Sequence, residues 1–347
     1  MRKSILDIDD DVKTGIDMKK YLTMCVVCMC LAFMACSGGN DRHTGEKVNV
    51  GLIFVPNVQF APFYVAMHNN YYSEEGLDVS FEFSSPADAI QFAGIGKFDF
   101  IIGDGEQVII ARDRGLPVRY ILSLYSKYPV AIASLSGSNI AEPRDLSGKT
   151  VGIPEYAGAS WIGFKSFLKA TGIDESDLEP VAIGYTQSAA LAQGRVDAAV
   201  VYINNAPVQL RMAGESIRLM RVDDHISLVS AGVITNDALI ENRPVIVEKF
   251  TRATRRGIEF VKANPPEALD ICFQFISEGG ENRKVQYEVL KESIKLYDDE
   301  FSVSAGTGAS DPGDWANTQS ILFDLKLIKE KKNIDVYFTN KYIINNN

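Results

Sequence analysis

One local pattern occurs twice in this sequence, once in each half of the chain. Residues 96–107 read GKFDFIIGDGEQ, and residues 194–207 read GRVDAAVVYINNAP. Both segments begin with a glycine, a basic residue, any residue and an aspartate, and continue with an apolar run and a polar cluster. A short apolar run bounded in this way is typical of a buried strand that enters a loop. The pattern therefore predicts two similar strand–loop–helix units, with chance recurrence of a common α/β motif as the alternative.

Strand-like and helix-like segments alternate around both copies of the pattern. Apolar or alternating runs predict strands, and apolar residues at helical spacing predict the helices between them. In the first half the expected strands are 48–55, 77–83, 98–103 and 118–125, and the expected helices are 61–70, 87–96 and 106–115. In the second half the expected strands are 151–154, 179–184, 197–202 and 217–222, and the expected helices are 160–172, 187–194 and 206–214. This order predicts an α/β fold with mixed, mostly parallel sheets flanked by helices.

Two further strand-like segments interrupt the alternation. Residues 129–135 (PVAIASL) follow the first half, and residues 227–235 (SLVSAGVIT) follow the second. The chain beyond them is mostly helical, and its last clear helix is expected at 315–328. In open parallel sheets, ligands bind beyond the carboxyl ends of the strands. We therefore expect residues 104–107 and 202–205 to lie on opposite walls of one cleft.

The N-terminal segment has the pattern of an export signal. Lys19 and Lys20 precede an apolar stretch, 21–35, that is shorter than the roughly 20 residues of a membrane-spanning helix. The stretch ends at Cys36, and this arrangement resembles a bacterial lipoprotein signal in which that cysteine carries the lipid. A membrane anchor that is never cleaved is the alternative, and in both cases the body of the protein lies outside the cytoplasmic membrane. The expected parts are a signal peptide at 1–35, with its true start at Met18, and a lipid-anchored tether at 36–46.

Composition disfavours several classes of site. Of the 5 cysteines, only Cys272 lies beyond Cys36, so neither a disulfide framework nor a thiolate metal site is expected. The 3 histidines are scattered, which disfavours a histidine-rich metal site or a histidine-based triad. The formal net charge is −10 and the chain has no basic tract, which disfavours a nucleic-acid partner. We therefore expect neither a metal nor a cofactor.

Several motifs resemble the NMT1/THI5-like branch of the solute-binding proteins of bacterial ABC importers. Residues 56–79 (PNVQFAPFYVAMHNNYYSEEGLDV) are similar to the opening motif of that branch, and residues 106–121 (EQVIIARDRGLPVRYI) are similar to its second segment. Residues 145–173 and 194–214 resemble its second-lobe motifs, and residues 314–328 resemble its closing helix. Each motif alone is weak, and it is their order and spacing that make the resemblance specific.

The resemblance extends from Val48 to about Ile344 and implies a two-lobed type II periplasmic-binding-protein fold. Each lobe would be a mixed, mostly parallel sheet flanked by helices, and the two interrupting segments would be connecting strands that act as a hinge. The implied boundaries are a first lobe at 47–134, a second lobe at 135–228 and a return to the first lobe at 229–347. The implied partners are a small heterocyclic ligand, the permease subunits of an ABC transporter and, through the lipid on Cys36, a membrane. We expect an extracytoplasmic monomer, in the periplasm or at the cell surface.

Ten residues near the expected strand ends are candidate ligand contacts. Pockets for small ring compounds are mostly apolar or aromatic, with a few placed polar groups. The expected loops supply both kinds of side chain, and the first candidate also matches the ligand-side asparagine of the family. The candidates are Asn57, Tyr64, Asp104, Glu106, Tyr156, Ser160, Trp161, Tyr185, Tyr202 and Asn204.

Several of these candidates have a purely structural alternative. Asn57 also suits a turn in which it binds its own backbone, and Tyr64 also suits the core. Asp104 and Ser160 also suit the caps of helices. Glu106 also suits a first helical turn, where the helix dipole favours a carboxylate. Trp161, at the start of a helix, is poorly explained by the core and favours stacking on a ligand, whereas the second tryptophan of the chain, Trp315, suits a lid or simple packing.

The candidate set contains carboxylates, amides and rings but no lysine or arginine. A buried anion needs a cation or many N–H donors, so the set favours a neutral or amine-bearing aromatic heterocycle. An aminopyrimidine offers N–H groups to Asp104 or Glu106 and a flat face to Trp161. Because the family is associated with pyrimidine precursors of thiamine, we expect such a precursor first. Riboflavin is the competitor, because the second-lobe motifs also resemble riboflavin-binding members.

An enzyme is the alternative from a different class, since eukaryotic members of the family are pyrimidine synthases. Those enzymes carry a lysine–glycine pair after the first helix, where this chain has Asn69 and Asn70. They also carry a cysteine-rich stretch that has no counterpart after Cys36. A Schiff-base lysine is therefore absent at that position, and we expect a binding protein and not an enzyme. A purely adhesive lipoprotein is a third alternative, but it would not need two matched polar clusters.

Overall fold

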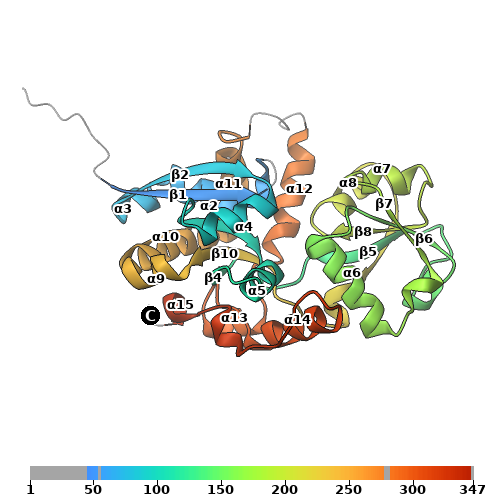
Figure 1. The fold of residues 1–347 in the computed structure, drawn as a ribbon. Helices are drawn as coiled ribbons and strands as arrows, with labels where there is room; N and C mark the ends of the chain where they lie inside the picture. Colours follow the sequence, from blue (N-terminus) through green and yellow to red (C-terminus); the bar gives the residue numbers. More distant parts are fainter. Residues whose placement is uncertain (1–44, 54–55, 277–281, 345–347) are drawn as a thin grey trace, which may run out of the picture. The chain divides into compact units, whose positions relative to one another are not determined.

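The computed structural model describes residues 45–53, 56–276 and 282–344 of the chain (Figure 1). The expected signal peptide, the expected lipidation residue Cys36 and the tether as far as residue 44 lie outside the described residues. The described part contains two five-stranded sheets with helices packed around them. No helix in this part is long and apolar enough to span a lipid bilayer. We call each sheet with its helices a lobe, numbered in chain order.

The sheet of the first lobe is mixed, with the strand order β2-β1-β3-β10-β4. Strand β1 runs parallel to β2 and β3, while β10 runs antiparallel to β3 and β4. In β1 the alternating residues Val48, Val50 and Leu52 are fully buried, as expected for a strand with one face on the core. The strands are β1 (Glu46–Ile53), β2 (Leu77–Ser84), β3 (Phe100–Asp104), β4 (Val118–Ser123) and β10 (Ala231–Asn236).

The sheet of the second lobe repeats this scheme, with the order β7-β6-β8-β5-β9. Strand β6 runs parallel to β7 and β8, and β5 runs antiparallel to β8 and β9. Each sheet thus has four strands that run in the same direction and one antiparallel strand, β10 or β5, in the fourth position. The strands are β5 (Val130–Leu135), β6 (Thr150–Ile153), β7 (Glu179–Ala182), β8 (Ala198–Tyr202) and β9 (Ile217–Arg221). The prediction of two similar α/β halves with mixed, mostly parallel sheets is confirmed.

Helices connect the parallel strands and form most of the C-terminal part of the chain. Helix α2 ends close to the predicted position, because Asn69 is its C-cap and Asn70 adopts the left-handed conformation with φ of 61°. The helices of the first lobe are α2 (Ala61–His68), α3 (Tyr71–Glu74), α4 (Pro86–Gly94), α5 (Gly105–Asp113), α9 (Asp237–Asn242), α10 (Pro244–Ala263), α11 (Pro265–Cys272), α12 (Arg283–Ile294), α13 (Glu300–Ala305), α14 (Pro312–Asp324) and α15 (Lys341–Ile344). The helices of the second lobe are α6 (Gly158–Thr171), α7 (Gln187–Ala192) and α8 (Ala206–Met212).

The chain passes between the two sheets twice. The predicted connecting strands become β5 and β10, and each of them is the antiparallel strand of the sheet that the chain has just entered. The crossings themselves are the segments 124–129 and 225–230, which precede these strands. Because β5 pairs with β8 and β9, residues 130–134 belong to the sheet of the second lobe and not, as we expected, to the first.

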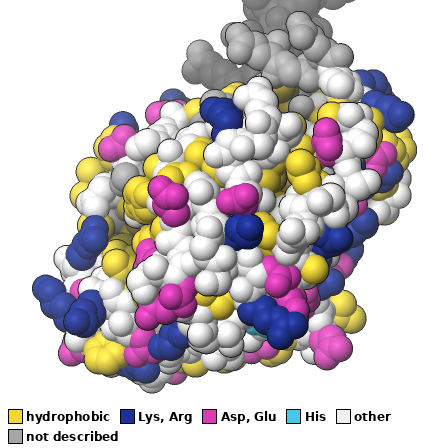
Figure 2. Space-filling view, turned by 90° about the vertical axis from the view of Figure 1, so that its right-hand side faces the viewer, with side chains coloured by type: hydrophobic (Ala, Val, Ile, Leu, Met, Phe, Trp, Pro, Cys, Tyr) yellow, Lys and Arg dark blue, Asp and Glu magenta, His cyan; other side chains and the backbone are white. Residues whose placement is uncertain are grey.

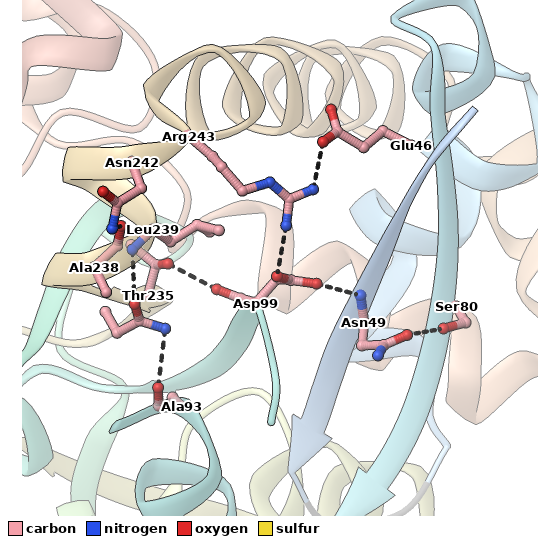
Figure 3. A network of polar contacts seen from close by, with 11 residues as sticks. Glu46, Asn49, Ser80, Ala93, Asp99, Thr235, Ala238, Leu239, Asn242 and Arg243 are labelled. Carbon is pink, nitrogen blue, oxygen red and sulfur yellow. Dashed lines mark hydrogen bonds and ion pairs between the residues drawn. The ribbon is translucent and has the colours of Figure 1, made fainter. Parts of the chain in front are cut away.

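The aspartate of the repeated pattern has the same structural role in both lobes. Asp99 Oδ2 accepts a hydrogen bond of 2.9 Å from the Asn49 backbone N–H, and its own N–H donates to the Asn49 carbonyl at 2.9 Å. Asp197 Oδ2 accepts from the Thr150 backbone N–H at 2.9 Å, and its own N–H donates to the Thr150 carbonyl at 3.0 Å. In both lobes this reciprocal pair joins the first central strand, β1 or β6, to the residue that precedes β3 or β8. Figure 3 shows the first pair within a wider network that includes Arg243.

The two lobes share buried apolar surface. One cluster of buried side chains includes Val50 and Phe250 of the first lobe and Val201 and Leu210 of the second. Helix α12 packs against α8 of the second lobe and also contacts the short 3₁₀ helix η1 (Val58–Phe60) of the first. Helix α12 therefore contacts both lobes.

Candidate functional site

Asp104 and Glu106 lie where β3 ends and α5 begins. Asp104 is the N-cap residue of α5, and its backbone N–H donates a long hydrogen bond of 3.4 Å to Gln107 Oε1. Glu106 lies in the first turn of α5. The positions that we named as structural alternatives, a helix cap for Asp104 and a first helical turn for Glu106, are therefore correct. These roles do not account for the burial of the two side chains, since Asp104 is 9% exposed and Glu106 is 1% exposed. Neither carboxylate oxygen of Glu106 accepts a hydrogen bond from any residue that the structure describes.

The surroundings of this carboxyl pair oppose ionisation. Burial raises the pKa of Asp104 to about 6. Burial, followed by the neighbouring Asp104 carboxylate, raises the pKa of Glu106 well above its usual value. No lysine or arginine of the described chain is among the groups that act on either carboxyl. The pair therefore carries less than its full negative charge at neutral pH.

Tyrosines from the first crossing segment and from the second lobe interact with this pair. Burial is the main reason why the pKa values of Tyr128 and Tyr202 lie well above that of a free tyrosine, and the carboxyls of Asp104 and Glu106 add to the effect. Burial also raises the pKa of Tyr125 to about 12, with a smaller contribution from Asp104. Asp104 at the end of β3 therefore acts electrostatically on Tyr202 at the end of β8, and the cleft that we expected between residues 104–107 and 202–205 stays a prediction.

Asn204 connects the second lobe to the C-terminal part of the first. Its side chain is fully buried, and its Nδ2 group donates to Ser293 Oγ on α12 at 2.9 Å and to the Tyr125 hydroxyl at 3.3 Å. Its Oδ1 atom is buried and has no hydrogen-bond partner among the described residues. The amide nitrogen of Asn204 therefore links the two lobes, while its amide oxygen receives no hydrogen bond from an N–H or O–H group of the described chain.

Asn57, which precedes η1, and Tyr64, which lies within α2, have the structural roles that we named as alternatives. Asn57 Oδ1 accepts a hydrogen bond of 2.8 Å from the Gln59 backbone N–H and so caps the turn into η1. Tyr64 is 1% exposed and stacks on Phe275, with ring centroids 4.7 Å apart and an angle of 6° between the planes. Its hydroxyl is buried and makes no hydrogen bond within 3.5 Å to a described residue, and burial raises the pKa of Tyr64 far above its usual value.

The second lobe presents rings at the ends of β6 and β7. Tyr156 is 55% exposed and lies edge-on to Trp161, with 5.4 Å between ring centroids and 88° between the planes. Tyr185 is 63% exposed, and its hydroxyl donates to Glu155 Oε1 at 3.0 Å. Burial of its hydroxyl end, Glu155 and, more weakly, Asp104 raise the pKa of Tyr185 to about 12.

Ser160 and Trp161 lie in the first turn of α6. The N-cap of α6 is Ala157, so the helix-cap alternative for Ser160 is wrong. Trp161 is partly buried and packs between the cores of the two lobes, and the Lys165 ammonium lies 5.1 Å from its ring centroid. Trp315 is different, because it is fully buried, stacks on Phe338 and donates from Nε1 to Ser310 Oγ at 2.8 Å. Trp315 is therefore a packing residue and not a lid.

Sequence reasoning missed the groups on the crossing segments and on α12. Tyr125 and Tyr128 come just before a predicted connecting strand, and that position was the available signal. No pattern in the sequence singles out Ser293 or Ser230, and the latter has a buried hydroxyl without a partner in the described chain. A hollow also lies beside the crossings, and none of the ten candidates is among its lining residues, which are Ser123, Tyr125, Ser126, Val229, Ser230, Asp299, Ala309, Ser310, Asp311 and Asp314.

The face of the molecule in Figure 2 offers little to a polyanion. The face in Figure 2 carries acidic and basic side chains in mixture, with small groups of hydrophobic side chains between them. A nucleic-acid interface usually gathers lysine and arginine into one basic region, and this face has none. Within the described ranges, no group of three or more histidine, cysteine, aspartate or glutamate residues is arranged to hold a metal ion.

The sequence and the fold are similar to those of known proteins. The sequence profile of the family described as NMT1/THI5 like matches residues 57–268. The riboflavin-binding protein RibY of Chloroflexus aurantiacus is 34% identical over 308 residues, which cover 88% of each chain. The formylaminopyrimidine-binding protein of Halalkalibacterium halodurans is 29% identical, over 87% of this chain and 92% of the relative. A 4-amino-5-hydroxymethyl-2-methylpyrimidine phosphate synthase of Legionella pneumophila is 26% identical, over 86% of this chain and 92% of the relative.

Solved structures confirm the predicted two-lobed fold. The periplasmic aliphatic sulphonate binding protein SsuA of Escherichia coli superposes with a TM-score of 0.68 at 13% identity, over 87% of this chain and 98% of that chain. At this identity the likeness shows the fold and not the ligand. The profile match over residues 57–268 and the 34% identity to RibY over most of both chains show the family as well as the fold. The chain therefore belongs to the NMT1/THI5-like family.

Proposed function

We propose that this protein is the extracytoplasmic substrate-binding component of an ABC importer and that it binds a neutral aromatic heterocycle between its lobes. The observation that supports this most is the set of buried polar atoms that lack partners. The carboxyl of Glu106 comes from the first lobe, and Oδ1 of Asn204 comes from the second. Buried polar atoms are almost always hydrogen-bonded, so unpaired acceptors at facing strand ends are best explained by donors that a ligand supplies.

Riboflavin is the first candidate ligand. The relative with 34% identity is named as a riboflavin-binding protein. The second lobe offers exposed rings at two strand ends, Tyr156 and Tyr185, and Phe83 at the end of β2 is 41% exposed. A fused three-ring ligand has enough flat surface to contact rings on both lobes, and such stacking contributes about 0.5–1.5 kcal/mol per ring pair.

A formylated or hydroxymethylated aminopyrimidine is the second candidate. The relative with 29% identity is named as a formylaminopyrimidine-binding protein. The unpaired carboxyl of Glu106 and the neighbouring Asp104 suit the amino group of such a ring. A single pyrimidine ring would contact fewer of the exposed rings than a flavin, which is why we place it second.

An enzyme of the pyrimidine-synthase type finds less support. At the end of the first helix, Asn69 is a C-cap and Asn70 adopts a left-handed conformation, so neither offers an amine for a Schiff base. Cys272 is buried, and burial raises the pKa of its thiol to about 12, which suppresses the reactive thiolate. The product of such an enzyme carries a phosphate, and its negative charge would be unfavourable near the Asp104–Glu106 pair, which has no neighbouring cation.

A thermal-shift screen of the protein without residues 1–36 tests the binding function. Riboflavin, flavin mononucleotide, formylaminopyrimidine, hydroxymethylpyrimidine and thiamine are compared at matched concentrations. A specific ligand at a hundred times its Kd stabilises the folded state by about 2.7 kcal/mol. We expect riboflavin or an aminopyrimidine to raise Tm, and the absence of a shift with every compound would refute the proposed ligand class. Turnover of any compound would instead support the enzyme.

The attachment to the membrane needs a separate test. We propose that Cys36 carries the lipid, on the basis of the N-terminal pattern that resembles a lipoprotein signal. The full chain, produced in a bacterium that is fed a labelled fatty acid, should incorporate the label, and the Cys36→Ser variant should not. Equal labelling of both proteins would place the lipid elsewhere and would leave the binding function to be judged by the thermal shifts.

A further inference from the structure

We propose that Glu106 is held as a neutral carboxylic acid and that it recognises a ring edge on which an acceptor atom lies beside an N–H donor. This inference deepens the proposed function and rests on it. A protonated carboxyl offers one O–H donor and one C=O acceptor side by side, whereas a carboxylate offers acceptors only. The difference decides which edge of a heterocycle the site can bind.

The position of Glu106 is fixed by close packing around the first turn of α5. Gly105 lies so near the second crossing segment that a Cβ atom on it would be 2.3 Å from Val229 Cγ1. The Gly105 backbone N–H also donates to the Ser230 carbonyl at 3.2 Å. The backbone that carries Glu106 is therefore held in place before any ligand arrives, which lowers the entropy that binding has to overcome.

The groups around Glu106 provide little compensation for a negative charge, because only its own backbone N–H lowers the pKa of the carboxyl, and burial and Asp104 act more strongly in the opposite direction. Both of its oxygens lack partners within the described chain, although the side chain is only 1% exposed. Asp104, two residues earlier, is a second buried carboxyl, and it opposes ionisation of Glu106. An unpaired carboxylate in such a place costs several kcal/mol, and the usual outcome is that the group keeps its proton.

The titratable groups that interact electrostatically with Glu106 come from two strands of the first lobe, from the first crossing segment and from the second lobe, and all are acidic or neutral. They are the carboxyl of Asp104 on β3, and the hydroxyls of Tyr120 on β4, Tyr128 before β5 and Tyr202 on β8. Asp314 on α14 raises the pKa of Tyr120, so it is a further carboxyl that interacts with the groups around Glu106. Lys165 on α6, a helix that packs against α5, is paired with Glu175 and lies over Trp161.

The proton identifies the chemical class of the ligand. Lactam and imide edges, in which C=O lies beside N–H, match a neutral carboxyl, and so do aminopyrimidine edges, in which a ring nitrogen lies beside N–H. Both edges occur in the candidate ligands of the preceding subsection. A phosphate ester would bring negative charge towards two carboxyls without a cation, so the unphosphorylated form of the heterocycle should bind and the phosphorylated form should be rejected.

The first test needs no ligand. Infrared spectra of the protein at pH 7 should contain a C=O stretching band from a protonated carboxyl. The band should lose intensity in the Glu106→Gln variant, although Asp314, whose pKa is raised to about 7, also contributes to it. It should keep its intensity in the matched control Glu241→Gln, which alters an exposed glutamate on α9. A band of equal intensity in the wild-type protein and in Glu106→Gln would overturn the proposal, because Glu106 would then be ionised.

The second test measures affinity for riboflavin and for formylaminopyrimidine by calorimetry between about pH 6 and pH 9. Wild-type affinity should fall as the pH rises, and phosphorylated ligands should bind at least tenfold more weakly. Glu106→Gln keeps one donor and one acceptor, so it should bind within about threefold of wild type with no dependence on pH. Glu106→Leu should lose tenfold or more. A Glu106→Gln variant as weak as Glu106→Leu would overturn the proposal, whereas failure of the wild-type protein to bind either compound would overturn the proposed function itself.

Discussion

Asp99 and Asp197 occupy the same place in the two copies of the repeated pattern, and each closes a reciprocal pair of hydrogen bonds with the neighbouring central strand. The side-chain bond is 2.9 Å long in both lobes. The glycines that open the two copies, Gly96 and Gly194, are left-handed with φ of 75° and 64°. The repeated glycine and aspartate therefore have a structural role, because they fix the turn before β3 and β8, the strands that each polar cluster follows. This relationship and the burial of the site residues lead to four predictions.

Removal of either aspartate should destabilise the protein, and Asp99 should matter more. Asp99→Ala loses the hydrogen bond from Asn49 and the ion pair with Arg243, whose guanidinium lies 3.6 Å away. Asp197→Ala loses only the hydrogen bond from Thr150, at an exposed position. A hydrogen bond of this kind contributes about 0.5–1.5 kcal/mol, and somewhat more with a charged acceptor. Urea unfolding should show a loss of about 1 kcal/mol for Asp197→Ala and a larger loss for Asp99→Ala. The opposite order would contradict this interpretation of the network.

Asp314 should make stability depend on pH. Burial, opposed by a hydrogen bond from Ser227, raises the pKa of Asp314 to about 7, above the value of about 3.9 in an unfolded chain. Between these values the folded state binds more protons than the unfolded state, so the free energy of unfolding falls as the pH rises from about 4 to 7. Asp314→Asn should flatten this slope, while Asp88→Asn, at an exposed position, should not. Urea midpoints measured from pH 4 to 8 check the difference, and parallel curves for all three proteins would exclude this contribution.

Asn204 should be needed for the contact between α12 and the second lobe. Asn204→Ala removes the bonds to Ser293 Oγ and to the Tyr125 hydroxyl, and a buried bond of this type costs about 1–3 kcal/mol when one partner is left behind. Asn205→Ala is the matched control, because Asn205 is only partly buried and its Oδ1 accepts a bond from Gln209 at the surface.

A double-mutant cycle isolates the Asn204–Ser293 contact. Asn204→Ala and Ser293→Ala should be less destabilising together than the sum of the single changes, by 0.5 kcal/mol or more. Strict additivity would show that the two side chains do not interact in solution. Ligand affinity of Asn204→Ala should also fall, because its unpaired Oδ1 is proposed to accept a bond from the ligand.

The two tryptophans should respond differently to the same substitution. Trp315→Ala should lower the free energy of unfolding by about 3–5 kcal/mol, because the side chain is fully buried. Trp161→Ala should lower it by less and should weaken ligand binding by up to about tenfold, the value of one lost stacking contact. Urea unfolding and ligand titration on the same samples check both effects. Unchanged affinity in Trp161→Ala would remove Trp161 from the site.

Most of the fold could be predicted from the sequence. The apolar runs and helical spacing located the strands and helices in both halves, and the repeated pattern indicated two similar sheets. These are local properties, because the period of the side chains and the turn residues that bound each element are set by the chain itself. The limits of the lobes were less certain, since β5 looks the same in sequence whichever sheet it joins.

The site depended on the tertiary structure to a greater degree. The sequence by itself determined which residue types stand at the strand ends, namely rings, amides and carboxyls without a lysine or arginine among them. Only packing between distant segments decided that Trp315 is core while Trp161 is not, that Asn204 bonds to Ser293, and that both oxygens of Glu106 are buried without a partner. Burial and pairing depend on which segments come together in space, and residues far apart in the chain determine them.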